Sequence, residues 1–129
     1  MTNSVRALVV AHASLAEALV AAVGVITGQA GVLRAISNER LGARDLHELI
    51  GKTLDETAAK VVFTDLPAGS CAIAARRLLG ERPDLAIVCG VNLPMLLEFV
   101  TRDANSPDAL AMAVARGREH VTVFGRDVG

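Results

Sequence analysis

The sequence predicts an α/β fold, a doubly wound and mostly parallel sheet with helices on both faces. Three observations support this. Short runs rich in valine, leucine and isoleucine alternate with longer segments of helical periodicity. The composition is 52% apolar but only 2% aromatic, so the core must consist of aliphatic residues, as is typical of buried parallel strands. The length of 129 residues suits a single domain, spanning 1–129, that buries a core of its own.

Five segments are expected to form strands. Four are short apolar runs of the kind found inside a parallel sheet. The fifth follows two consecutive helices and is expected to run antiparallel at an edge. Arg34 interrupts the second run, which places that strand near an edge. The predicted ranges are 5–11, 31–37, 60–64, 85–90 and 121–124.

Five helices are expected between these strands, giving a sheet with right-handed crossovers. Ser14 and Glu17 have the spacing of a capping box at the start of the first helix. Ser70 is expected to cap the third helix, and Ser106 the fifth, with Pro107 at its first position. The predicted segments are 15–26, 44–59, 71–79, a short helix ending at residue 101, and 107–119.

The composition also excludes several classes of function. A net charge of −1 and the absence of Trp and Tyr argue against nucleic-acid binding, which needs basic patches or stacking aromatics. No run reaches the 18 or so apolar residues of a membrane span. Cys71 and Cys89 lack metal-ligand spacing and are interpreted as reduced thiols. We therefore expect a cytoplasmic protein without a metal site.

His12 is the first candidate for a functional residue. It lies on the turn between the first predicted strand and the first predicted helix. In an open parallel sheet such turns lie at the carboxyl ends of the strands, where ligands bind, and a helix N-terminus there favours anions. The position therefore predicts that His12 interacts with an anionic group.

The loop after the third predicted strand is the second candidate. If the first and third strands are neighbours, the carboxylate of Asp65 can reach His12 and fix its tautomer, which leaves the other ring nitrogen free as a nucleophile. The N–H groups of Ala68, Gly69 and Ser70 can bind the oxygens of a phosphoryl group. From the residues alone, a purely structural interpretation is equally open, in which His12 is a structural histidine, Asp65 forms a turn and Ser70 caps a helix.

Three segments of the chain carry a resemblance to a known family. They span 8–16 around His12, 62–70 around Asp65, and 90–96, which reads Gly-Val-Asn-Leu-Pro-Met-Leu. In order and spacing they resemble the signature segments of the mannose-type enzyme IIA proteins of the bacterial phosphoenolpyruvate-dependent sugar phosphotransferase system. The similarity extends over nearly the whole chain.

The resemblance implies a phosphoryl carrier. In that family the matching histidine accepts phosphate from the phosphocarrier HPr and passes it to enzyme IIB, which phosphorylates sugar during uptake. His12 matches this phosphohistidine, and Asp65 matches the aspartate that leaves Nε2 as the phosphorylated atom. Gly69 and Ser70 match the phosphate-binding loop. No cofactor is implied, and the membrane permease is reached only through enzyme IIB. The family fold implies a homodimer in which the strand 121–124 is exchanged.

Two departures from the family pattern concern the phosphate site. Ala13 and Ala68 occupy positions that are commonly glycine, and an alanine is strained by roughly 1 kcal/mol wherever its φ must be positive. Two alternatives to the transport function stay open. One is a regulatory phosphohistidine protein that serves no transporter. The other is a nucleotide-binding doubly wound module, although the turn at His12 lacks the Gly-x-Gly-x-x-Gly pattern.

Overall fold

A four-stranded parallel sheet forms the centre of the molecule. The structure, a computed structural model, describes residues 5–126. The sheet order is β2-β1-β3-β4, and all three pairings are parallel. The predicted α/β class is therefore confirmed, β1 and β3 are neighbours, and β2 lies at an edge as Arg34 indicated. The strands are β1 (Ala7–Ala11), β2 (Leu33–Ser37), β3 (Val61–Thr64) and β4 (Ala86–Cys89).

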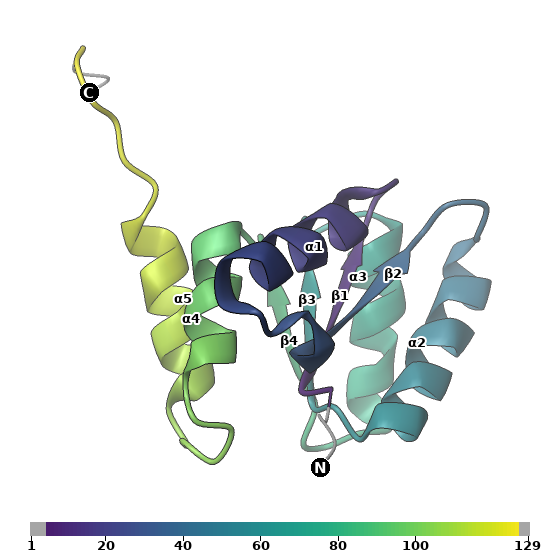
Figure 1. Ribbon diagram of the computed structural model, residues 1–129. Helices are drawn as coiled ribbons and strands as arrows, with labels where there is room; N and C mark the ends of the chain where they lie inside the picture. The colour runs from purple at the N-terminus through teal and green to yellow at the C-terminus, as the bar shows by residue number, and fades with distance from the viewer. Residues whose placement is uncertain (1–4, 127–129) are drawn as a thin grey trace.

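Helices cover both faces of this sheet (Figure 1). One face packs against α1 (Leu15–Thr27), α4 (Leu93–Thr101) and α5 (Ala109–Glu119). The other face packs against α2 (Ala43–Thr57) and α3 (Ser70–Arg76). Two short 3-10 helices, Ala30–Val32 and Arg77–Gly80, complete the regular structure of residues 5–126. Among residues 5–126, no helix is both long and apolar enough to cross a membrane.

The buried strand β1 shows why the sequence forms two layers of core. All five of its residues are fully buried. Leu8 and Val10 point into the cluster beneath α2 and α3, whereas Val9 points into the cluster beneath α1 and α4. The alternation follows from the two-residue period of a strand. Since both faces are covered, the strand is apolar throughout, and the first polar side chain after it is that of His12.

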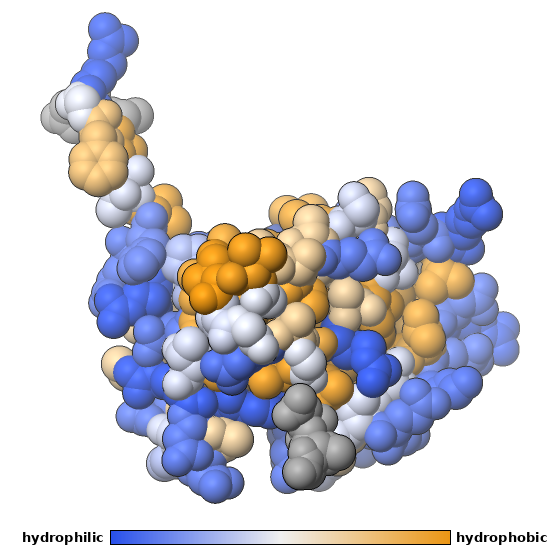
Figure 2. All heavy atoms as spheres, viewed as in Figure 1, coloured by the Kyte–Doolittle hydropathy of each residue, from blue (hydrophilic) through white to orange (hydrophobic). Residues whose placement is uncertain are grey.

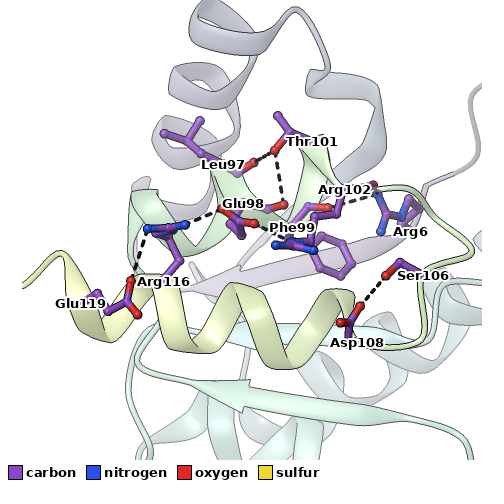
Figure 3. A network of polar contacts seen from close by, with 10 residues as sticks. All are labelled: Arg6, Leu97, Glu98, Phe99, Thr101, Arg102, Ser106, Asp108, Arg116 and Glu119. Atoms are coloured by element: carbon purple, nitrogen blue, oxygen red, sulfur yellow. Dashed lines mark hydrogen bonds and ion pairs between the residues drawn. The ribbon is translucent and has the colours of Figure 1, made fainter.

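Helix α5 is fixed against α4 by close packing and by charge. The Asn92 side chain accepts the N–H of Met95 as the N-cap of α4, and its Nδ2 donates to the carbonyl of Gly117 at 2.9 Å. A Cβ atom on Gly117 would lie 2.8 Å from Met95 Cε and 2.9 Å from Met95 Cβ. Glu98 forms ion pairs with Arg102 and Arg116 (Figure 3). These contacts set the direction in which the chain leaves α5.

Several predicted helix starts were wrong in detail. Ser14 is the N-cap of α1, but within the described chain its side chain makes no capping bond, so the capping box with Glu17 is not formed. Gly69, not Ser70, is the N-cap of α3. The N-cap of α5 is Asp108, whose carboxylate accepts the hydroxyl of Ser106, so the helix starts after Pro107. The expected helix 71–79 is divided into α3 and the 3-10 helix that follows.

The predicted fifth strand is not formed in the single chain. Residues 121–124 carry no strand pairing and run away from the body beyond α5 (Figure 1). Their apolar side chains are exposed: Val121 by 76%, Val123 by 65% and Phe124 by 92%. Figure 2 shows the chain segment beyond α5 standing clear of the rest of the molecule. A strand needs a partner edge, and the path of the chain after α5 leads away from the sheet of this same molecule.

Candidate functional site

His12 and Asp65 meet at the carboxyl edge of the sheet. His12 directly follows β1 and Asp65 directly follows β3, so the pairing of these strands brings the two residues together. The Nδ1 atom of His12 lies 2.8 Å from Oδ2 of Asp65. The backbone N–H of His12 donates to the same oxygen at 3.0 Å. Both contacts arise from residues adjacent to strand ends, which makes the geometry rigid.

The electrostatics of Asp65 fix the tautomer of His12. Burial alone would raise the pKa of Asp65, whose side chain is 10% exposed, but the hydrogen bonds and charge of His12 outweigh it and lower that pKa. The carboxylate is therefore ionised at neutral pH and can only accept hydrogen bonds. It follows that Nδ1 of His12 carries a proton, and that in the neutral ring the lone pair is on Nε2. The second carboxylate oxygen, Oδ1, is buried without a hydrogen-bond partner among residues 5–126.

Gly69 lies against the free side of the imidazole. Its φ of 94° and ψ of 178° belong to a region that only glycine adopts readily. A Cβ atom at this position would lie 3.7 Å from Cε1 and 3.8 Å from Nε2 of His12. The glycine therefore leaves open the space in front of Nε2. Within the loop from Ala68 to Ser70 that is expected to bind phosphate, Gly69 thus lies beside the ring.

Of the two alanines that replace common glycines, only Ala13 adopts a strained backbone. Its φ is 52°, whereas Ala68 is absent from the positive-φ residues of the described chain. The turn at Ala13 is secured by two side chains from the end of β2. The Ser37 hydroxyl donates to the Ala13 carbonyl at 2.7 Å, and the Ala13 N–H donates to Oδ1 of Asn38 at 3.1 Å. These bonds offset the cost of the left-handed conformation.

Asn38 is a site residue that sequence reasoning missed. Besides accepting the Ala13 N–H, its side chain donates from Nδ2 to the Ser70 hydroxyl oxygen at 3.3 Å. The sequence shows only a polar loop at 38–42. One signal was available: Asn38 directly follows a predicted strand, so it lies on the same edge as His12 and Asp65 once the strands are parallel.

Cys71 completes the inner wall of the site. Its Sγ lies 4.0 Å from Nδ1 of His12, and the side chain is buried. Burial and the nearby Asp65 carboxylate raise the pKa of this thiol to about 11, so it is protonated at neutral pH. The possible ligand atoms of His12, Asp65 and Cys71 all lie within 4.8 Å of one another. In the protonated state, however, Cys71 acts as a neutral neighbour that leaves Asp65 as the charged partner of the ring.

The fold and the site define a class: a doubly wound α/β protein whose sheet edge presents a histidine oriented by a buried carboxylate. Comparison with known families identifies the family to which the chain belongs. A family model for the EIIA-man group, described as the PTS system fructose IIA component, matches residues 6–115. The chain therefore belongs to this family of IIA components of the phosphotransferase system (PTS). Membership supports a phosphotransfer role in a sugar phosphotransferase system.

Individual relatives agree with this assignment. The mannose-specific EIIAB component of the PTS from Escherichia coli K12 is 34% identical over 71 residues, covering 53% of this chain and 22% of that protein. The chain thus matches about a fifth of the curated relative's length. Among solved structures, a mannose/sorbose-specific IIA subunit from Enterococcus faecalis has a TM-score of 0.78 at 24% identity, covering 98% of both chains. Component EIIA from Streptococcus agalactiae has a TM-score of 0.82 at 21% identity, covering 92% of this chain and 96% of that one. At these identities the two structures show the fold.

Proposed function

We propose that this protein carries a phosphoryl group on Nε2 of His12, accepting it from phospho-HPr and passing it to enzyme IIB for sugar uptake. One observation supports this above all others. The Asp65 carboxylate, 2.8 Å from Nδ1, leaves Nε2 as a free lone pair facing the open space beside Gly69. Transfer between two proteins requires a nucleophilic nitrogen on an accessible side chain, because both partners must reach the same atom, and the His12 side chain is 40% exposed. The family membership of residues 6–115 supports the same role.

The transfer step needs only groups that the site contains. The Nε2 lone pair attacks the phosphorus of the phosphohistidine on HPr, a new N–P bond forms, and the old N–P bond breaks with its electron pair returning to the HPr imidazole. The ring of His12 then carries positive charge, which the Asp65 carboxylate stabilises. Transfer to a histidine of enzyme IIB is the same displacement in reverse. Positioning and electrostatics account for such a step, so no cofactor enters it.

The loop after β3 is proposed to bind the phosphoryl oxygens. The backbone N–H groups of Ala68, Gly69 and Ser70 and the Ser70 hydroxyl are the candidate donors, since Gly69 lies beside the His12 ring. The left-handed φ of Gly69 turns the chain sharply at this point. Such turns bring successive N–H groups to one side, which favours an anion.

The partners are proposed to dock on the apolar surface around His12. Leu15 lies in the segment that follows β1, and Leu66 and Ile73 lie in the segment that follows β3; the three side chains are exposed by 43%, 53% and 45%. HPr and enzyme IIB would use this surface in turn, on the cytoplasmic side, and the permease would be reached only through IIB. The half-exposed His12 ring, 40% accessible at its side chain, lies within reach of such a partner.

The direct experiment is incubation with labelled phospho-HPr, followed by a chase with a candidate IIB. We expect the wild-type protein to take up label and to release it to IIB. The variant His12→Ala should take up none, whereas the control His47→Ala, changed on helix α2, should behave as wild type. Labelling of His12→Ala to the wild-type level would overturn the proposal. Labelling of wild type without release to any IIB would instead support a regulatory phosphohistidine protein.

The C-terminal segment supports a second part of the proposal, a homodimer with exchanged strands. Strand β4 lies at the edge of the sheet, and its residues are only half buried. Residues 121–124 supply exposed apolar side chains, including Phe124, one of only three phenylalanines in the chain. Antiparallel pairing of this segment with β4 of a second copy would satisfy an open edge and bury these side chains.

Sedimentation analysis of the full chain tests the dimer. Wild type is expected to sediment as a dimer at micromolar concentration. The variant Val123→Lys places a charge in the proposed strand and should be monomeric, whereas Glu119→Lys, a charge change at the exposed end of α5, should remain dimeric. A wild-type monomer, or a Val123→Lys dimer of unchanged affinity, would contradict the exchange.

A further inference from the structure

Asn38 joins three segments at the carboxyl edge of the sheet. Its backbone N–H donates to the carbonyl of Ala11 at 3.2 Å, which continues the pairing of β2 with β1. Its carbonyl accepts the N–H of Leu41 at 3.0 Å and closes the turn of its own loop. The backbone on both sides of the side chain is therefore fixed. The amide group then reaches the two other segments, the turn after β1 and the loop after β3.

The orientation of this amide follows from its partners. The N–H of Ala13 is only a donor, so the atom that faces it at 3.1 Å must be the oxygen Oδ1. The nitrogen Nδ2 consequently faces the hydroxyl oxygen of Ser70, at 3.3 Å. Nδ2 can only donate, so Ser70 Oγ is the acceptor in this contact. A serine hydroxyl that accepts in this way keeps its own proton for another partner.

We propose that Asn38 is a positioning residue for the phosphoryl group, because its amide keeps the proton of the Ser70 hydroxyl available for a phosphoryl oxygen on His12. Ser70 directly follows Gly69, which lies against the Nε2 side of the ring. The inference rests on the proposed phosphohistidine, and it adds Asn38 to the residues that position the phosphoryl group. Asn38 acts through Ser70 and through the turn at Ala13, without contact to the reacting atoms.

The same residue links the two halves of the site. The turn at Ala13, which follows the nucleophile, is strained and depends on the side chains of Ser37 and Asn38. The loop of Ser70 belongs to the other strand, β3. A single planar amide thus sets the distance between the nucleophile's turn and the hydroxyl of the phosphate loop. Loss of either of its bonds is expected to make the distance between the Ala13 turn and the Ser70 hydroxyl more variable. Phosphoryl transfer depends on a fixed distance between these groups.

The variant Asn38→Asp separates the contact with the Ala13 N–H from the contact with the Ser70 hydroxyl. An aspartate keeps an oxygen to accept the Ala13 N–H, but it presents a second oxygen to Ser70 and captures the hydroxyl proton. We expect the equilibrium constant for phosphoryl exchange with phospho-HPr to fall about tenfold. The control Asn105→Asp makes the same charge change in the loop between α4 and α5 and should leave this constant unchanged. Thermal unfolding of each variant verifies the fold.

A double-mutant cycle with Ser70→Ala shows whether Asn38 acts through the hydroxyl. In that background we expect Asn38→Asp to lower the exchange constant less than about threefold. Asn38→Ala, measured in both backgrounds, covers the case in which the aspartate variant does not fold. Its effect should also be smaller in the Ser70→Ala background, with a remainder in both backgrounds from the lost bond to the Ala13 N–H. An equal decrease in both backgrounds, or none in either, would overturn the inference while wild-type phosphorylation upholds the carrier function. A wild-type protein that accepts no phosphate would overturn both.

Discussion

At the residue scale, the activity proposed for His12 depends on one oxygen atom. Oδ2 of Asp65 accepts both the backbone N–H and the Nδ1–H of His12, so the ring is fixed in position and in tautomer at once. Burial raises the pKa of Asp65, but the hydrogen bonds and charge of His12, with a smaller contribution from the backbone N–H of Asp65 itself, lower it below its usual value. The proposed nucleophile and its carboxylate therefore form a single unit.

The first residue-scale prediction concerns the variant Asp65→Asn. The amide can still fill the space, but it lacks the charge that stabilises the ring during transfer. We expect the fold to be retained and the rate of transfer from phospho-HPr to fall on the order of 10²-fold, as for removal of one positioned electrostatic group. Rapid-quench measurement of phosphoryl transfer checks this. A rate equal to that of wild type would remove Asp65 from the mechanism.

The lowered pKa of Asp65 also predicts a pH dependence of stability. The folded pKa lies below the unfolded value of about 3.9, so the carboxylate contributes stability that is complete above that value and lost as the pH falls through the folded pKa. Urea unfolding of wild type and Asp65→Asn should show the wild-type free energy of unfolding rising relative to the variant up to about pH 4 and running parallel to it above. A constant difference throughout the acid range would contradict the pairing.

Gly69 gives a further residue-scale prediction. The change Gly69→Ala imposes a backbone cost of about 1–3 kcal/mol and places a methyl group beside Nε2. We expect phosphorylation of His12 to fall more than about tenfold, beyond the loss of stability. The control Gly28→Ala also alters a positive-φ glycine, but one with open space around it at the end of α1. Phosphorylation should be normal in Gly28→Ala, and equal loss in both variants would mean that backbone strain, not the methyl group, is responsible.

At the element scale, the strands could be predicted well and the helix ends less so. The apolar run of β1 and the position of His12 after it are properties of neighbouring residues, so the sequence pattern suffices to place them. The N-caps of α3 and α5 depend on how the preceding loops fold, and there Gly69 and Asp108 took the positions expected for Ser70 and Ser106. The contact of Asn38 with Ser70 joins residues 32 positions apart, which no local pattern contains.

The packing of α5 on α4 supplies the element-scale prediction. A Cβ atom on Gly117 would lie within 3.0 Å of Met95 and Asn92, and the Cβ of Met95 cannot swing away. We expect Gly117→Ala to lower the free energy of unfolding by about 1–3 kcal/mol. Gly80→Ala, at an open position, should change it little by comparison. Chemical denaturation of both variants measures the difference, and a stabilised Gly117→Ala variant would contradict the close helix contact.

At the scale of the whole molecule, the order of the strands creates the site. Parallel strands β1 and β3 end side by side, with β2 next to β1, so the residues that follow all three meet at one edge (Figure 1). The sequence predicted this edge once the two central strands were taken as neighbours. It could not show what happens to residues 121–124, because their pairing depends on which edge the chain reaches after α5, a property of the assembled helices.

The most direct test of the account is the position of the phosphoryl group on the protein. After reaction of ¹⁵N-labelled protein with phospho-HPr, NMR of the histidine side chains identifies which ring nitrogen is bonded to phosphorus. The account predicts a single phosphohistidine at Nε2 of His12, with Nδ1 still protonated and bonded to Asp65. Phosphate on Nδ1, on another histidine or on Cys71 would contradict it.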